Sequence, residues 1–378
     1  MELYCDYSAT TPVLPEALVS MMPYLIDGYG NPSSLYTKGR EARTAVENAR
    51  IVISSILYCQ PEEIFFTSGG TEGDNLAIKG IAHERGKKGL YITTTIEHPA
   101  VLNCFKELEQ QGYRVVYLNV SSNGRVKINE LIELMDNKEK INFVSIMYAN
   151  NELGTIQDIQ YIGNMLKKYD KDIIFHTDAV QAVGKVKINL KEQNVDILTA
   201  SGHKFGAPKG IGFIYIKNGT NMIPQNLGGG QETGMRSGTE NVASIVGMAK
   251  ALEFHDTKHK ECKSQENVLI SLLNLIPNTH FNSSDLIEKI DGVVNVRFDG
   301  IDAQALLTYL DNKNICVSAG SACHSDSDTP SHVLKAIGLT DEEALSSIRI
   351  SFDGSISLAE IEYLAKHISE GVEYLRNF

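Results

Sequence analysis

The chain has 378 residues, of which 42% are hydrophobic and 22% charged, as in an ordinary soluble globular protein. Its 47 Asp and Glu against 35 Lys and Arg give a net charge of −12, which argues against nonspecific binding of nucleic acid. No apolar run reaches about 18 residues, so we expect no membrane span. The first residues, MELYCDYSATTP, lack the basic and apolar regions of a secretory signal.

The cysteines are scattered along the chain and form no C-x-x-C pair. This spacing favours neither a disulfide framework nor a zinc ribbon, so we expect no metal site. It predicts a reducing, cytoplasmic compartment, and packing in the core is the default expectation for all the thiols except Cys323. The six residues are Cys5, Cys59, Cys104, Cys262, Cys316 and Cys323.

Between residues 60 and 217, short apolar runs alternate with helical patterns, which is typical of an α/β domain with a mostly parallel sheet. Several runs are rich in β-branched and aromatic residues without polar alternation, as expected of strands covered on both faces. The predicted strands lie in EEIFFTS (62–68), GLYITT (89–94), RVVYLNV (114–120), INFVSIMYA (141–149), DIIFHTDA (172–179), VDILTAS (195–201) and GIGFIYI (210–216).

One long helix is predicted over 240–263, and a new pattern of apolar runs follows it. GVVNVRF, NICVSAG and SIRISF indicate strands, whereas AQALLTYLD and the segment that begins at Leu358 indicate helices. Together these elements predict a second, smaller α+β domain.

The stretch FFTSGGTEGDN (65–75) ends the first of these strands. Open parallel sheets bind ligands beyond the carboxyl ends of their strands. Two glycines allow a tight turn, Thr71 with Asp74 fits a helix-capping pattern, and backbone N–H groups at a helix start bind phosphate well. A plain strand–turn–helix corner explains this stretch equally well.

Asp178 follows the apolar run of FHTDAVQ (175–181), where a buried carboxylate could face a ligand. An unpaired charge in a dry site is costly, so a buried Asp needs a partner such as a protonated ring nitrogen. Taken alone, Asp178 is explained more simply as the N-cap of a helix.

Lys204 lies between two apolar strands in TASGHKFGAPKGIGFIYI (199–216), which is a poor position for a solvated charge. A lysine in a dry pocket can form a Schiff base, and the alternative is a point charge that binds phosphate. A phosphate site, a buried Asp and a buried Lys are what pyridoxal 5'-phosphate (PLP) requires. A nucleotide site is less well supported, because neither G-x-x-x-x-G-K-[ST] nor a helix-opening G-x-G-x-x-G occurs.

Two further stretches fit the same pocket. His98 follows the strand in TTTIEHPAV (93–101) and could stack on the cofactor or move a proton, although a structural histidine is the simpler interpretation. The glycine-rich stretch 227–241 carries Thr239, and its simpler interpretation is a mobile connection.

Cys323 stands in SAGSACHSDSDTP (318–330), a run of small, polar and acidic residues. A thiol is unexpected there, because free cysteines usually pack as small hydrophobes. A metal or protease site built on Cys323 and His324 lacks further ligands at a usable spacing.

Together these stretches resemble the cysteine desulfurases of the class V aminotransferase group, which are PLP enzymes of fold type I. The resemblance implies an α/β fold with a large, mostly parallel seven-stranded-sheet domain over 15–250. It also implies a small α+β domain, formed by 1–14 and 251–378, that carries the cysteine loop. The matching motifs, in chain order, are YCDYSATTPVLPEAL, GYGNPSSLYTKGREAR, FTSGGTEGDNLAIKG, IEHPAVLN, VSIMYANNELGTIQDI, HTDAVQAVGK, SGHKFGAPKGIG, GGGQETGMRSGTEN and SAGSACHS.

The resemblance implies a role for each candidate residue. Lys204 would carry PLP as a Schiff base, Asp178 would pair with the pyridine nitrogen and Gln181 would bond the ring oxygen. His98 would stack on the ring and assist proton transfers, and Arg349 would clamp the substrate carboxylate. The other implied contacts are Gly70, Thr71, Ser201 and His203 to the phosphate, Asn151 to the cofactor or substrate, and Thr239 from the other subunit of a homodimer.

The implied reaction converts L-cysteine and an acceptor thiol into L-alanine and a persulfide on Cys323, with Lys204 removing the Cα proton. Glycine and serines around Cys323 would let this segment swing to a sulfur-acceptor protein, such as an iron–sulfur scaffold or a thiolation enzyme. The alternatives are a selenocysteine lyase or another PLP-dependent β-lyase or aminotransferase on the same scaffold. A non-catalytic protein that retains the fold would have lost Lys204, Asp178 or Cys323.

Overall fold

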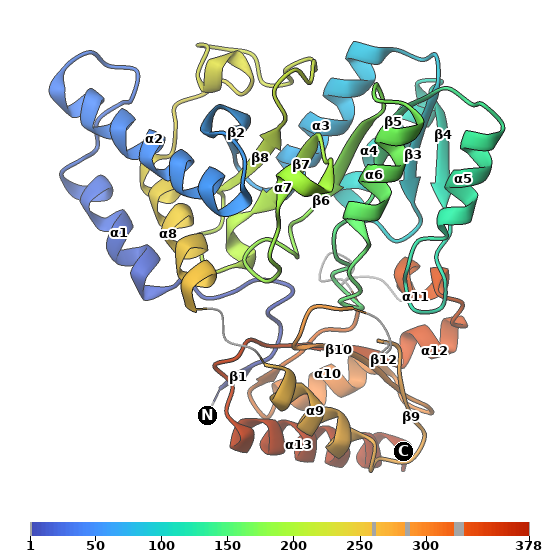
Figure 1. The fold of residues 1–378 in the computed structure, drawn as a ribbon. Helices are drawn as coiled ribbons and strands as arrows, with labels where there is room; N and C mark the ends of the chain where they lie inside the picture. Colours follow the sequence, from blue (N-terminus) through green and yellow to red (C-terminus); the bar gives the residue numbers. More distant parts are fainter. Residues whose placement is uncertain (1, 259–261, 284–287, 321–328, 378) are drawn as a thin grey trace.

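The computed structural model describes residues 2–258, 262–283, 288–320 and 329–377, with a wide sheet and its helices above a smaller unit (Figure 1). Cys323 lies outside the described residues. The strands are β1 (Leu3–Tyr4), β2 (Ile64–Thr67), β3 (Leu90–Thr94), β4 (Arg114–Leu118), β5 (Ile141–Ser145), β6 (Ile174–Asp178), β7 (Ile197–Ser201), β8 (Gly212–Ile216), β9 (Thr279–Phe281), β10 (Val293–Phe298), β11 (Ile315–Cys316) and β12 (Ser347–Ser351).

The helices surround the wide sheet and cover one side of the smaller unit (Figure 1). The α-helices are α1 (Pro15–Ile26), α2 (Thr37–Leu57), α3 (Gly70–Arg85), α4 (Pro99–Gln110), α5 (Ile128–Asp136), α6 (Ile159–Tyr169), α7 (Leu190–Gln193), α8 (Val242–Lys258), α9 (Lys263–Leu273), α10 (Ala303–Asp311), α11 (His332–Ala336), α12 (Asp341–Leu345) and α13 (Leu358–Arg376). Three short 3₁₀ helices are η1 (Pro61–Glu63), η2 (Gly202–Lys204) and η3 (Glu232–Gly234).

The wide sheet has seven strands in the order β2-β8-β7-β6-β5-β3-β4. Its neighbouring strands are parallel except where β8 pairs antiparallel with both β2 and β7. Every predicted strand run between residues 60 and 217 contains one of these seven strands. The predicted mostly parallel seven-stranded sheet is therefore confirmed.

Successive side chains of the strands enter two different cores, as expected of a sheet covered on both faces. On β8, Phe213 and Tyr215 join a core with α2, α6 and α8, whereas Ile214 and Ile216 join a core with α3 and α4. This double burial explains why the strand sequences show no polar alternation.

The smaller unit contains the three-stranded antiparallel sheet β12-β10-β9, packed with α9, α10 and α13 in a core of its own. Both ends of the described chain lie in this unit (Figure 1). The predicted helices at AQALLTYLD and from Leu358 are confirmed as α10 and α13, and the long helix predicted over 240–263 is α8. The α/β and α+β division is thus observed, while the exact boundaries 15–250 and 251–378 stay a prediction.

The N-terminal segment connects the two units. Leu3 and Tyr4 pair with Ile315 and Cys316 of the smaller unit. The chain then runs to the wide sheet, where the Thr11 N–H donates to the His203 carbonyl oxygen at 3.0 Å. This course brings residues 6–11 across the carboxyl end of β7.

No helix in the described parts of the chain combines the length and apolarity needed to cross a membrane.

Candidate active site

A pocket of about 270 Å³ lies where β2, β3, β6 and β7 end. Its walls contain ten of the twelve site residues predicted from the sequence: Gly70, Thr71, His98, Asn151, Asp178, Gln181, Ser201, His203, Lys204 and Arg349. Thr239 is exposed and does not line this pocket, and Cys323 lies outside the described residues. The pocket thus gathers, in one chain, nearly all of the candidates that could be placed.

The start of α3 forms one wall of the pocket. Gly69 has φ of +151°, a conformation that favours glycine, and a Cβ on Gly70 would come within 2.7 Å of Val180 Cγ2. Ser201 approaches the same turn, since a Cβ on Gly69 would lie 3.5 Å from its Oγ. The first N–H groups of a helix lack intrahelical partners, so this close-packed turn suits a phosphate.

The predicted capping pattern of Thr71 and Asp74 is wrong. The helix begins at Gly70, its N-cap is Gly69, and no side chain caps it. Asp74 instead lies within the first turns of α3 and is fully buried, lining the floor of the pocket. A residue noted only as a helix cap is therefore part of the site.

Asp178 ends β6 and is buried at the pocket. Its Oδ1 accepts a hydrogen bond from the Val180 N–H at 2.9 Å, so the residue also caps the turn that follows it. Burial raises the pKa of Asp178 to about 6, while the Val180 bond and the Lys204 charge oppose this rise. A carboxylate held in such a place is stabilised by a cation, and a protonated ring nitrogen would supply one.

Asp74 and His176 lie behind Asp178. Burial, followed by repulsion from Asp178, raises the pKa of Asp74 well above its usual value. Asp74 Oδ1 has no hydrogen-bond partner among the described residues and lies 3.7 Å from His176 Nε2. Burial lowers the pKa of His176 to about 3, so this ring is neutral. We therefore assign the proton of the carboxyl pair to Asp74 and the charge to Asp178.

Lys204 ends the 3₁₀ helix η2, directly after β7. Its Nζ donates hydrogen bonds of 2.7 Å to the carbonyl oxygens of both Ser8 and Ala9. The same N-terminal segment is held by Thr10 and Thr11, which bond His203. Ser8 and Ala9 are not among the predicted site residues, although they belong to YCDYSATTPVLPEAL, the first matching motif.

Gln181 and His98 complete the walls around the amine. Gln181 Nε2 donates to the Ser8 carbonyl oxygen at 2.9 Å. His98 is the N-cap of α4, and its Nδ1 accepts a hydrogen bond from the Ala100 N–H at 3.1 Å. A neutral His98 ring then carries its proton on Nε2. The structural and the functional interpretations of His98 are thus compatible, because one nitrogen caps the helix while the residue lines the pocket.

Glu97 directly precedes His98 and is fully buried. Its Oε1 accepts hydrogen bonds of 2.8 Å from Thr94 Oγ1 and from the Met147 N–H. Burial raises the pKa of Glu97 to about 8 despite these two bonds. The carboxyl group therefore carries a proton at neutral pH and adds no charge beside the pocket.

Arg349 of β12 brings the smaller unit to the pocket, with its side chain 1% exposed. Its Nη2 lies 2.6 Å from Asp6 Oδ1, and its Nη1 donates to the Asn151 carbonyl oxygen at 3.0 Å. Its Nε has no hydrogen-bond partner among the described residues. A buried, positioned guanidinium that keeps further N–H donors beyond these two contacts fits a small carboxylate.

The glycine-rich loop 227–241 is anchored by a buried ion pair. Arg50 Nη2 lies 2.8 Å from Glu232 Oε1, and the Phe66 N–H donates to Glu232 Oε2 at 2.8 Å. Glu232 itself has φ of +48°, so this contact holds the loop in a conformation that is uncommon for a non-glycine residue. Thr239, near the end of the same loop, is exposed to solvent.

These groups fit PLP on observations of the structure itself. At the start of α3, a Cβ on Gly70 would clash with Val180, so only glycine fits there. A close-packed backbone turn at the start of a helix suits a phosphate group. Asp178 is a buried carboxylate in the same pocket as the Lys204 amine. Within the described part of the chain, no group of three or more His, Cys, Asp or Glu is arranged to hold a metal ion.

Comparison with known proteins gives the same family along the whole chain. The profile of the family "Aminotransferase class-V" matches residues 3–364. A protein named cysteine desulfurase from Nostoc sp. is 44% identical, over 99% of this chain and 94% of its own length. One named cysteine desulfurase IscS from Clostridium botulinum is 43% identical, over 99% of this chain and 95% of its own length.

Solved structures agree with these sequences. A NifS-like protein has a TM-score of 0.92 and 38% identity, and the match covers 99% of this chain and 100% of that one. A structure described as SspA in complex with cysteine has a TM-score of 0.83 and 38% identity, covering 94% of this chain and 99% of that one. The chain therefore belongs to the class-V aminotransferase family, among its cysteine desulfurases.

Proposed function

We propose that this chain is a PLP-dependent cysteine desulfurase, which converts L-cysteine and an acceptor thiol into L-alanine and a persulfide on Cys323. The observation that carries this proposal is the single pocket lined by Lys204, Asp178 and Arg349. Such an enzyme needs an amine that bonds the PLP aldehyde, a carboxylate that pairs with the pyridine nitrogen, and a guanidinium that binds the substrate α-carboxylate. Relatives of nearly the same length that are named cysteine desulfurase support the assignment.

Each wall of the pocket would hold a different part of the cofactor. When bound, PLP supplies an electron-accepting ring that makes the Cα proton of an attached amino acid acidic. Lys204 would hold the aldehyde carbon, Asp178 the ring nitrogen and Gln181 the ring oxygen, with His98 against the ring. The phosphate would lie at the start of α3, held by Gly70, Thr71, Ser201 and His203.

The chain's own residues then bind and convert the substrate. Arg349 binds the α-carboxylate through its guanidinium, and Asn151 lies beside it at the pocket wall. Lys204 accepts the Cα proton once its amine is free, because it reaches into the same pocket. The Cys323 thiolate attacks the substrate Sγ. The Cβ–Sγ bond breaks as the new S–S bond forms, and a proton on Cβ completes alanine.

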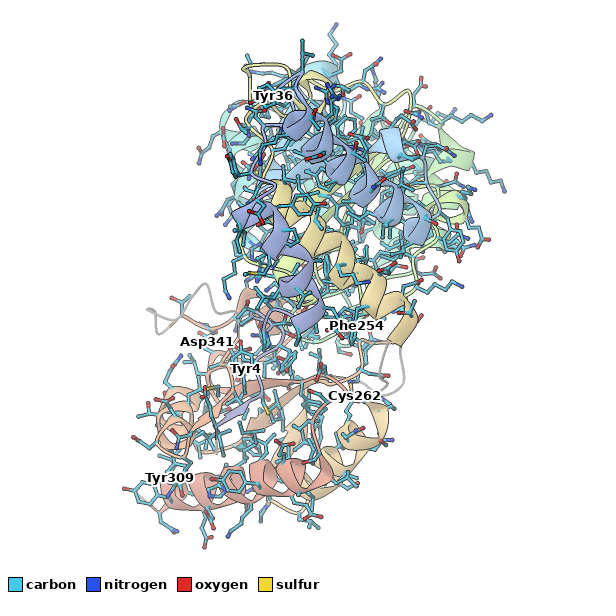
Figure 2. The ribbon with its side chains drawn as sticks, turned by 90° about the vertical axis from the view of Figure 1, so that its left-hand side faces the viewer. Tyr4, Tyr36, Phe254, Cys262, Tyr309 and Asp341 are labelled. Carbon is cyan, nitrogen blue, oxygen red and sulfur yellow. The ribbon has the colours of Figure 1, made fainter. Side chains whose placement is uncertain are left out.

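We also propose that the active enzyme is a homodimer. The helix α1 lies at one outer side of the molecule, where it faces the viewer in Figure 2. An exposed apolar face of this kind marks an interaction surface. In a dimer the exposed Thr239 would reach the partner's phosphate site. The exposed apolar residues of α1 are Leu18, Val19, Met22, Leu25 and Ile26.

The remaining proposals concern the setting of the reaction. The persulfide sulfur would pass to an acceptor protein, such as an iron–sulfur scaffold or a thiolation enzyme. We propose a cytoplasmic location, no direct binding of nucleic acid or membrane, and domain boundaries at 15–250 and at 1–14 with 251–378. Size-exclusion chromatography and limited proteolysis test the dimer and the boundaries.

The decisive experiment replaces Cys323 by serine. Wild type should form alanine and acquire radiolabelled sulfur that a thiol reductant releases. Cys323→Ser should do neither, while the visible absorption of bound PLP at ~420 nm remains. Cys316→Ser is the matched control, because Cys316 lies seven residues earlier in the chain, on β11, and does not line the pocket, so the variant should behave as wild type.

Two results would contradict the proposal. Undiminished cysteine turnover in Cys323→Ser would show that this thiol is not the sulfur acceptor. Faster turnover of selenocysteine than of cysteine by wild type would favour a selenocysteine lyase instead.

A further inference from the structure

Lys185 lies behind the wall of the proposed active site. It follows the last residue of β6, Asp178, by seven positions, and its Nζ donates a hydrogen bond of 2.8 Å to Gln181 Oε1. Gln181 lines the active-site pocket, whereas Lys185 does not. Lys185 lines a neighbouring cavity of about 550 Å³, which also contains Phe254 and Cys262 and which shares Ser8 and Lys204 with the active-site pocket. Its hydrogen bond to the wall of the active site is the one to Gln181.

The contact fixes which way the Gln181 amide faces. The Lys185 nitrogen donates this hydrogen bond, and its charged form has three donors and no acceptor, so the amide oxygen is the end of Gln181 that faces it. The amide nitrogen must then point away from it, and indeed donates to the Ser8 carbonyl oxygen at 2.9 Å. Two contacts at opposite ends of one amide leave a single orientation, in which the second N–H of the amide is the group available to a ligand.

The surroundings make the Lys185 contact exceptional. Burial, followed by the positive charges of Lys204 and Arg349, lowers the pKa of Lys185 to about 7, while Cys262 opposes this fall. The carboxylates of Glu288, Asp291 and Asp353 line the same cavity, but the acceptor of the Lys185 amine is the Gln181 amide oxygen. The Lys185 amine has thus lost hydration and lies near two positive charges, and its hydrogen-bond acceptor is the uncharged amide oxygen of Gln181.

We propose that Lys185 is a positioning residue for the desulfurase reaction, which orients Gln181 so that an N–H, and not the carbonyl oxygen, faces the ring oxygen of PLP. This inference rests on the proposed function, because it requires the cofactor beside Gln181. A donor stabilises the anionic form of that oxygen, whereas a reversed amide would repel it. The proton held between the ring oxygen and the nitrogen of Lys204 is then bound less tightly.

The test is the pH dependence of the visible absorption of the holoenzyme, from about pH 6 to about pH 10. In Lys185→Met the midpoint should rise by about one pH unit, because the amide is then held at one end only, by the Ser8 carbonyl oxygen, and can turn its oxygen toward the ring oxygen. Lys185→Arg keeps a cationic donor and should restore a midpoint close to that of wild type. Lys187→Met is the matched control: this exposed lysine, two residues along, should leave the midpoint unchanged.

A double-mutant cycle separates action through Gln181 from direct action of the charge. In a Gln181→Ala background, Lys185→Met should cause little further shift. Gln181→Glu provides an independent test that leaves Lys185 its acceptor but removes the donor, and it too should raise the midpoint. This variant keeps the inference testable where Lys185→Met does not fold.

Three outcomes overturn the inference. The first is an unchanged midpoint in Lys185→Met, the second is a full shift that persists in Gln181→Ala, and the third is a wild-type midpoint in Gln181→Glu. Each can occur in an enzyme that forms alanine normally, so each removes the inference and leaves the proposed function intact. A wild-type protein with no PLP band overturns both.

Discussion

Replacing Arg349 by lysine keeps a cation in the pocket but removes the planar fork that a carboxylate needs. Two of the guanidinium nitrogens are occupied, by Asp6 at 2.6 Å and by the Asn151 carbonyl oxygen at 3.0 Å. Each of these two nitrogens keeps a second N–H, and Arg349 lines the pocket, so the fork can still donate to a substrate carboxylate. A lysine amine held by Asp6 would lose at least one charge-assisted hydrogen bond to the α-carboxylate. That loss is worth about 1.5–3 kcal/mol, or about 10- to 150-fold in kcat/KM for L-cysteine.

Alanine formation at varied cysteine concentrations measures this loss, which should appear mainly in KM. Arg297→Lys is the matched control, because Arg297 lies on the neighbouring strand β10 and pairs with Glu343 away from the pocket. The PLP absorption should be unchanged in both variants. The reasoning is refuted if Arg349→Lys keeps kcat/KM within about twofold of wild type, or if the control loses as much.

Asp178→Asn should lower alanine formation by about a hundredfold or more in steady-state assays, because the ring nitrogen loses its charged partner. Glu97→Gln should stabilise the protein increasingly as pH rises. The raised pKa of Glu97 means that wild type loses stability between its usual pKa and about 8, because in that range the unfolded state releases the carboxyl proton while the folded state keeps it. Urea unfolding at pH values across that window should show the two stabilities diverging by about 2–5 kcal/mol; parallel curves would contradict this. Arg50→Met should cost about 3–5 kcal/mol in the same assay, since it strands the buried Glu232 carboxylate. Adding Glu232→Gln should recover part of that loss.

The strands of the wide sheet could be predicted because each is covered on both faces and therefore needs apolar side chains at successive positions. GIGFIYI contains β8, with Phe213 and Tyr215 in one core and Ile214 in the other. The direction of β8 could not be predicted in the same way. A strand buries the same side chains whether it runs parallel or antiparallel to its neighbours, so the pattern is silent about β8 pairing antiparallel on both sides.

The pocket residues that could be predicted are those with distinctive side chains at strand ends, such as Lys204 and Asp178. Ser8 and Ala9 contribute carbonyl oxygens, which every residue has, and Ala9 lies 195 positions from its partner Lys204. The capping error at Asp74 has a related cause. The start of α3 is set by the backbone conformation at Gly69, which the side-chain pattern of Thr71 and Asp74 does not reveal.

The central claim is that the amine at position 204 holds the PLP aldehyde. Borohydride reduction of the holoenzyme, followed by digestion and mass spectrometry, tests it most directly. A phosphopyridoxyl group is expected on the peptide that contains Lys204 and on no other. The group found on Lys185, whose amine bonds Gln181, or an unlabelled protein, would contradict the assignment.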